Sequence, residues 1–115
     1  MLITNYSSSI WCDRAFGVAI QPDGKIVTAG GASLAIRGLG ASGWRPKFTV
    51  ARYSADGTLD TSFGGDGIVK TNFSRGAGTE IASAVAIQSD GKIVAVGRAL
   101  RHGELAFAAA RYLAA

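Results

Sequence analysis

A ten-residue stretch occurs twice in this 115-residue chain, and the repetition restricts the fold more than any other feature. The first copy is VAIQPDGKIV at 18–27, and the second is VAIQSDGKIV at 85–94, 67 residues later and with one substitution. Each copy has an apolar run, an Asp-Gly turn and a second apolar run. Asp-Gly between apolar runs is typical of a β-hairpin, because glycine adopts a positive φ without steric cost. The pattern predicts two similar β-rich units.

The repetition extends beyond these two hairpins. TNYS at 4–7 aligns without gaps with TNFS at 71–74, and FTVARY at 48–53 matches FAAARY at 107–112 at a spacing of 59. The difference of 8 is an insertion in the first copy, within the glycine-rich stretch 31–47. A fixed period that is interrupted at a loop is typical of a repeat protein. We therefore expect one repeat domain over 1–115, with a first repeat unit at 2–66 and a second at 67–115.

Each unit contains four candidate strands. They are 2–6, 15–21, 25–30 and 47–53 in the first unit, and 67–73, 82–88, 92–97 and 105–113 in the second. In 15–21, the large residues Phe16, Val18 and Ile20 alternate with Ala15, Gly17 and Ala19. This alternation predicts a strand that is covered on both faces, with a close approach on the small side.

Four short strands per repeat, joined by tight turns, favour an all-β, propeller-like fold with two four-stranded antiparallel blades. An eight-stranded β-sandwich is the alternative. Consecutive pairing of neighbouring strands would indicate blades, whereas Greek-key crossings between the copies would indicate a sandwich. Two blades cannot close a ring, so two sheet faces would stay exposed over more area than a monomer usually leaves uncovered. The expected partners are therefore further copies of the same repeat, in the same chain or in a homo-oligomer.

Three segments carry a family resemblance: VAIQPDGKIVTAG at 18–30, FTVARYSADGTLDTSFGGDGIV at 48–69, and FAAARY at 107–112. Together they closely resemble the delta-60 repeat, a bacterial tandem-repeat family. The resemblance implies β-propeller-like units in tandem, usually in large exported or surface proteins. It implies no enzyme activity, because that family has no established catalytic motif. The opening residues Met1 to Thr4 lack the basic start and long apolar stretch of a signal peptide.

Neither a cofactor nor a metal site is predicted. Residues 38–43 match G-x-G-x-x-G, but Pro46 and a strand pattern follow where dinucleotide binding requires a helix. The carboxylates of Asp56, Asp60 and Asp66 lack the spacing of a calcium loop, so they are expected to bond local N–H groups. His102, the only histidine, lies in a predicted loop with no catalytic partner near it in the sequence.

The expected function is therefore that of a non-enzymatic scaffold for structure, surface display or binding. The alternative is a fragment of a propeller hydrolase or lyase whose active site lies in other repeats. Arg52 and Arg111 occupy twin positions among apolar neighbours, and a buried charge must be paired. A structural ion pair with a carboxylate such as Asp60 is the favoured interpretation.

Charge placement indicates where a partner would bind. The segments 7–14, 31–47, 74–80 and 98–106 are expected to share one end of the blades, and they carry the whole net charge of +4. A tryptophan among arginines there can stack on a sugar while the cations hold an anionic group. The predicted partner is thus an acidic polysaccharide or acidic protein; nucleic acid is not favoured at this modest charge, and no apolar run is long enough for a membrane span. The candidate partner-binding residues are Arg37, Trp44, Arg45, Lys47, Arg98 and Arg101.

Overall fold

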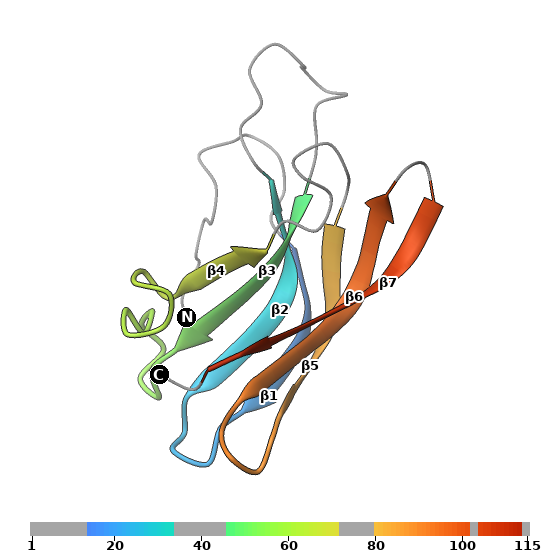
Figure 1. The fold of residues 1–115 in the computed structure, drawn as a ribbon. Helices are drawn as coiled ribbons and strands as arrows, with labels where there is room; N and C mark the ends of the chain where they lie inside the picture. Colours follow the sequence, from blue (N-terminus) through green and yellow to red (C-terminus); the bar gives the residue numbers. More distant parts are fainter. Residues whose placement is uncertain (1–13, 34–45, 72–79, 102–103, 114–115) are drawn as a thin grey trace.

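Two antiparallel sheets make up the part of the chain that the computed structural model describes, residues 14–33, 46–71, 80–101 and 104–113 (Figure 1). The first sheet contains β1 (Arg14–Ile20), β2 (Ile26–Ser33), β3 (Pro46–Tyr53) and β4 (Ile68–Thr71). The second sheet contains β5 (Glu80–Ile87), β6 (Ile93–Arg101) and β7 (Glu104–Tyr112). The described residues form no helix. The strand expected at 2–6 lies outside them.

Both sheets are simple meanders, with strand orders β1-β2-β3-β4 and β5-β6-β7 and antiparallel pairing throughout. This is the consecutive pairing that distinguishes propeller blades from a Greek-key sandwich, so the predicted fold is confirmed. β4 comes from the start of the second repeat unit and completes the first sheet. The first sheet is therefore one whole blade made from continuous sequence.

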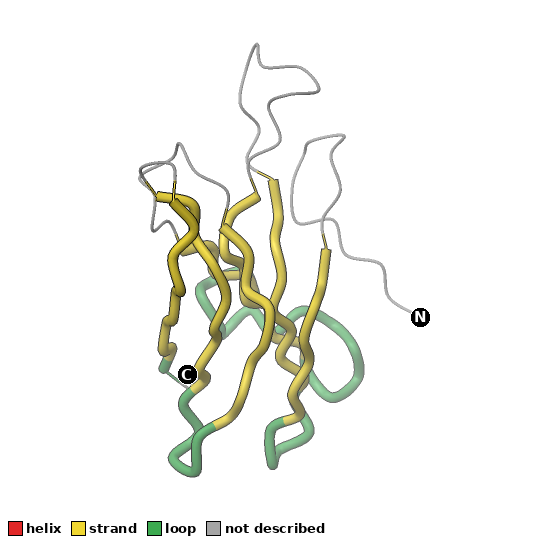
Figure 2. Tube along the Cα trace, turned by 90° about the vertical axis from the view of Figure 1, so that its right-hand side faces the viewer, coloured by secondary structure: helices red, strands yellow, loops and turns green. Residues whose placement is uncertain are grey.

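The two Asp-Gly turns have the same local structure. In the first, the Gln21 amide donates to the Lys25 carbonyl at 2.8 Å and the Gly24 amide donates to the Gln21 carbonyl at 2.9 Å. Gln88 and Gly91 repeat these bonds at the same distances in the second turn. Gly24 has φ 89° and Gly91 has φ 88°, a conformation that favours glycine. Both turns lie at one end of the molecule, and the strand ends that border 34–45, 72–79 and 102–103 lie at the other (Figure 2).

A β-bulge in each of β1 and β5 changes the faces that the alternation predicts. The register of β1 with β2 shifts between Ala15 and Gly17, and the register of β5 with β6 shifts between Ala82 and Ala84. A bulge inserts one extra residue into a strand, so residues before it lie on the opposite face from the one that simple alternation gives. Ala15 pairs with Gly30 and therefore shares a face with Val18, not with Gly17 as expected.

The inner faces of the two sheets pack together, with β5 against β1, β2 and β3. The core consists of Val27, Ala29, Phe48, Val50 and Phe63 on the first side and Ala82, Ile93, Ala95, Ala99 and Ala108 on the second. The Thr71 and Tyr112 hydroxyls, 2.6 Å apart, form a hydrogen bond between β4 and β7. This packing places the small side of β1 against β5, as the alternation predicts.

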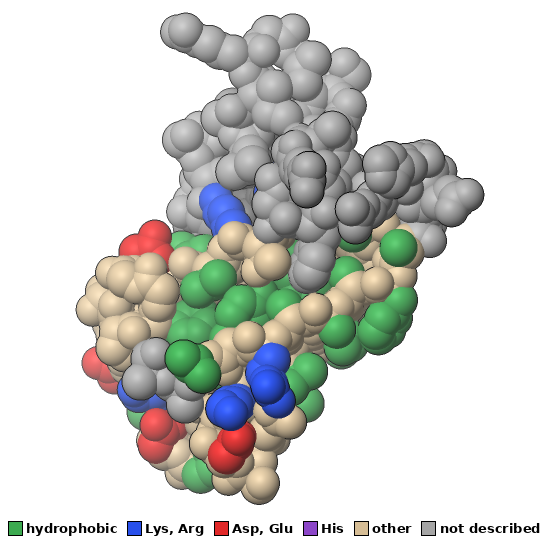
Figure 3. Space-filling view, viewed as in Figure 1, with side chains coloured by type: hydrophobic (Ala, Val, Ile, Leu, Met, Phe, Trp, Pro, Cys, Tyr) green, Lys and Arg blue, Asp and Glu red, His purple; other side chains and the backbone are tan. Residues whose placement is uncertain are grey.

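Each sheet also has an outer face that points away from the other sheet. On the first sheet this face carries Val18, Ile20, Ile26 and Thr28 of β1 and β2, which are exposed or half-buried, and Thr49 and Ala51 of β3, which are buried. On the second it carries Ala84, Ala86, Val94, Val96, Arg98, Phe107, Ala109 and Arg111. Val18 is 66% exposed and Ile20 is 71% exposed, so the expectation that β1 is covered on both faces is wrong for this chain on its own. Hydrophobic side chains are also visible along the outer side of the second sheet (Figure 3).

Candidate functional site

The predicted partner-binding residues of the second unit lie on a strand rather than in a loop. β6 continues to Arg101 and β7 begins at Glu104, so most of the loop expected at 98–106 is a β-hairpin. Arg98 is exposed and lies opposite Phe107, while Arg101 lies opposite Glu104 in the register. Both positions are at the end of the sheet away from the Asp-Gly turns (Figure 2), and their part in binding stays a prediction.

Three of the candidate residues, Arg37, Trp44 and Arg45, lie outside the described residues. The same is true of the glycine-rich match at 38–43 and of His102. Their part in binding stays a prediction.

Lys47 is placed differently from the prediction. It belongs to β3, its side chain is 1% exposed, and its Nζ lies 4.0 Å from Oε2 of the fully buried Glu80. A buried cation requires an opposite charge, and Glu80 of β5 supplies it across the two sheets. Lys47 is therefore a link between the sheets and not part of a partner-binding surface. The charge analysis assigned Lys47 to the segment 31–47 and Glu80 to the segment 74–80, and this hid the pair, although Lys47 is also the first residue of the candidate strand 47–53.

The expected ion pair of Arg52 is present. Arg52 Nε donates to Asp60 Oδ2 at 2.8 Å, and Lys25 Nζ lies 3.0 Å from the same oxygen. Arg52 Nη2 donates to Ser62 Oγ at 3.1 Å, and the Arg52 guanidinium lies 4.9 Å from the centre of the buried Phe63 ring. These residues, which we call the Arg52 cluster, join the first Asp-Gly turn to the long connection between β3 and β4.

The charge of Asp60 is strongly stabilised within this cluster. The Ser62 hydroxyl donates to Asp60 Oδ1 at 2.6 Å and the Ser62 amide donates to it at 3.1 Å. The Ser62 hydroxyl, together with Lys25 and the Arg52 charge, holds the pKa of the Asp60 carboxyl far below its usual range, against the opposing effect of burial. Asp60 is consequently an ionised structural carboxylate.

Every aspartate in the described part of the chain accepts a hydrogen bond from the backbone amide two residues later. The donors to Asp23, Asp56, Asp60, Asp66 and Asp90 are the amides of Lys25, Thr58, Ser62, Ile68 and Lys92, at 3.0 to 3.1 Å. This is the Asx-turn geometry, in which a carboxylate fixes its own turn. The backbone bonds from Thr58 and Lys92 are the main reason that the pKa values of Asp56 and Asp90 are lowered.

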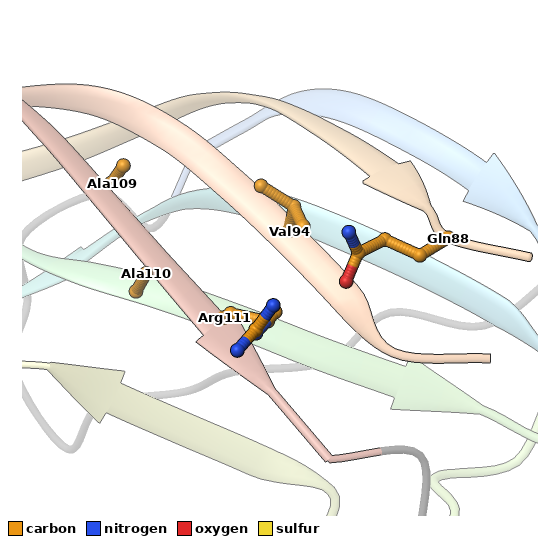
Figure 4. Close-up of a pocket in the computed structure, with 5 residues that line it drawn as sticks. All are labelled: Gln88, Val94, Ala109, Ala110 and Arg111. Atoms are coloured by element: carbon orange, nitrogen blue, oxygen red, sulfur yellow. The ribbon is translucent and has the colours of Figure 1, made fainter. Parts of the chain in front are cut away.

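An open hollow of about 440 Å³ lies on the second sheet (Figure 4). It is lined by Gln88, Val94, Ala109, Ala110 and Arg111. Arg111 was expected to be buried and paired like its twin Arg52, but it is exposed. Within the ranges that the structure describes, no three His, Cys, Asp or Glu residues gather where they could hold a metal ion. Nor do those ranges include a helix that could cross a membrane.

Two face-to-face antiparallel meanders, repeated in sequence and joined through a common core, define adjacent blades of a β-propeller. A family model described as a domain of unknown function (DUF5122) beta-propeller matches residues 21–63 and 88–114, which include the two Asp-Gly turns. The chain therefore belongs to the DUF5122 β-propeller family. A comparison with curated proteins gave no match.

Proposed function

We propose that this chain is a non-enzymatic propeller module of the delta-60 type, which serves as a structural, surface or binding scaffold. The family match supports the repeat, and the three motifs at 18–30, 48–69 and 107–112 support the delta-60 assignment. The two matched segments begin at Gln21 and Gln88, which are equivalent positions of the two copies.

The observation that carries the proposal is the use of the carboxylates. A propeller hydrolase or lyase needs carboxylates, histidines or a metal that converge on the substrate. Here the five described aspartates each fix a local turn, and Glu80 lies against Lys47. The innermost strands contribute mainly apolar side chains, as in RAFGVAI of β1. The alternative, a hydrolase or lyase fragment, would require an active site from other repeats.

The binding partner that the charge favours is an acidic polysaccharide. Arg98 is exposed near the end of the sheets that is opposite the Asp-Gly turns, and Arg101 follows it on the same strand. Arg37, Trp44 and Arg45 belong to the same predicted surface, where an indole can stack on a sugar ring. The engagement of Lys47 with Glu80 removes one cation from that surface.

Binding to dextran sulfate at low and high salt tests this function. We expect measurable binding that weakens with salt, and that weakens at least several-fold when Arg98 and Arg101 are both replaced by glutamine. Replacing Trp44 by alanine should weaken it further. Lys92→Gln is the matched control, because it removes a cation at the opposite end of the sheet. Equal affinity in all variants, or binding that does not depend on salt, would contradict the polysaccharide assignment. Depolymerisation of a polysaccharide by the chain would favour the enzyme alternative.

A further inference from the structure

The outer face of the first sheet is the repeat equivalent of a face that is packed inside the molecule. Shifting Val18 and Ile20 by 67 residues gives Val85 and Ile87 of β5. Val85 and Ile87 pack against the core between the sheets, whereas Val18 and Ile20 are 66% and 71% exposed. The same side chains are thus packed in one copy and uncovered in the other.

The converse holds for the outer face of the second sheet. Phe107 on this face is 80% exposed, whereas its equivalent Phe48 is completely buried against the second sheet. Arg111 is exposed as well, and its equivalent Arg52 is 1% exposed. Ala84 is exposed, and its equivalent Gly17 lies on the inner face of β1. The face that the first sheet buries is therefore the face that the second sheet leaves open.

The hollow on the second sheet follows the same rule. Its lining residues are Gln88, Val94, Ala109, Ala110 and Arg111, and the equivalents in the first copy are Gln21, Val27, Val50, Ala51 and Arg52. All five equivalents are buried, and Val27, Val50 and Arg52 lie on the inner face that packs against the second sheet. Ala51 pairs with Thr28 and lies on the outer face. The equivalent place on the first sheet is thus covered by protein, which indicates that the hollow is half of an interface.

These relations define two complementary surfaces on one chain. The interface inside the chain joins the inner face of the first sheet to the inner face of the second. The repeat equivalent of the first sheet's inner face is the outer face of the second sheet. The repeat equivalent of the second sheet's inner face is the outer face of the first sheet. We propose that a second copy of this chain binds the first. The outer face of the first sheet in one copy packs onto the outer face of the second sheet in the other copy, and this contact repeats the internal interface between the two sheets. The inference rests on the proposed repeat-module function and names the partner that the module requires.

The internal interface specifies which side chains would meet. Within the chain, Tyr112 packs against the core and its ring lies edge-on to Phe63 at 6.2 Å. Tyr53 is the equivalent of Tyr112 and is half-buried. The repeated interface therefore brings Tyr53 of the second copy onto the outer face of the second sheet. Val18 and Ile20 of that copy come to lie against the small side chains Ala84 and Ala86, just as Val85 and Ile87 lie against β1.

The contact is head-to-tail, because two different faces meet. Such an interface leaves one of each face available after every addition, so it continues until a ring closes. Burial of apolar side chains supplies the driving force, because Val18 and Ile20 on one face and Phe107 on the other are mostly exposed in the single chain. A contact between two identical faces would instead stop at a dimer.

Two charge variants test the arrangement by sedimentation equilibrium. Val18→Glu blocks the outer face of the first sheet, and Ala86→Glu blocks that of the second; both positions are exposed, so neither should disturb folding. The wild-type chain should form assemblies with a mass of at least twice the single-chain mass of 11.8 kDa. Each variant alone should have the single-chain mass. An equal mixture of the two variants should form a species of two chains and stop there, because one intact face of each kind remains.

The control is Ala55→Glu, which places the same charge on an exposed alanine in a turn and should keep the wild-type mass. A wild-type chain that stays at 11.8 kDa would overturn the proposal, as would assembly that only one variant prevents or a variant mixture that never associates. Circular dichroism of each variant shows whether it is folded. The measurement contains no polysaccharide, so its outcome is separate from the binding test: a chain that does not assemble can still bind dextran sulfate.

Discussion

Gly17 of β1 lies against Ala84 of β5, its own equivalent in the second copy of the repeat. A β-carbon on Gly17 would be 3.1 Å from the Ala84 Cα and 3.2 Å from the Ser83 carbonyl oxygen. The two sheets therefore meet through backbone at this point, and the missing side chain sets how closely they approach.

Gly17→Val is expected to lower the free energy of unfolding by about 1–3 kcal/mol, because the added side chain meets backbone that cannot move without separating the sheets. Chemical denaturation at a concentration where the chain is monomeric measures the change. Ala86→Val is the control, because it adds bulk to an exposed alanine on the outer side of β5 and should change the stability little. Equal losses in both variants would show that the close approach at Gly17 has no special cost.

Asp60→Asn should destabilise the fold at neutral pH by roughly 3 kcal/mol, because it removes the carboxylate to which the buried Arg52 guanidinium donates. It should also reduce the loss of stability in acid. The pKa of Asp60 in the folded chain is below its unfolded value of about 3.9. As the pH drops through the unfolded pKa toward the folded one, the unfolded state binds more protons, so the free energy of unfolding falls.

Unfolding measured between neutral and strongly acidic pH checks both effects of Asp60→Asn. Asp66→Asn is the matched control. Asp66 is exposed, and the bond described for it is the one that it accepts from the Ile68 amide within its own turn. An unchanged acid profile in Asp60→Asn would mean that the Arg52 cluster does not control acid stability.

Lys47 and Glu80 are expected to be strongly coupled. Lys47→Met or Glu80→Gln alone should each cost about 3 kcal/mol, since each removes one charge of a buried ion pair. The double variant should cost clearly less than the sum, and a double-mutant cycle of unfolding free energies measures the difference. Additive costs would indicate that the two residues act separately in the core.

Gly91→Ala should cost about 1–3 kcal/mol, because Gly91 has φ 88° and a β-carbon is strained there. Ser89→Ala in the same turn is exposed and should be nearly neutral. Thermal unfolding measures the stability of both variants. Gly91→Ala reports the cost of a side chain at a positive φ, and Ser89→Ala reports the effect of a surface substitution in the same turn. A neutral Gly91→Ala would show that this turn relaxes to accommodate a side chain.

Local patterns in the sequence predicted most of the strand order. The Asp-Gly turns, the meander of each sheet and the Arg52–Asp60 pair all involve residues near one another in the chain, so short motifs describe them well. The bulges escaped prediction, because the pairing register shifts at Phe16 and Ser83 while no change in the sequence pattern marks either position.

The twin arginines show what the sequence by itself determined and what only the tertiary structure decided. ARY at 51–53 and ARY at 110–112 place Arg52 and Arg111 at equivalent positions of equivalent strands, and this much followed from the repeat. Yet Arg52 is buried and paired, whereas Arg111 is exposed. Burial depends on what packs against a face, and the second sheet covers only one face of the first. The Lys47–Glu80 link has the same origin, since its partners come from different sheets and meet only when those sheets pack.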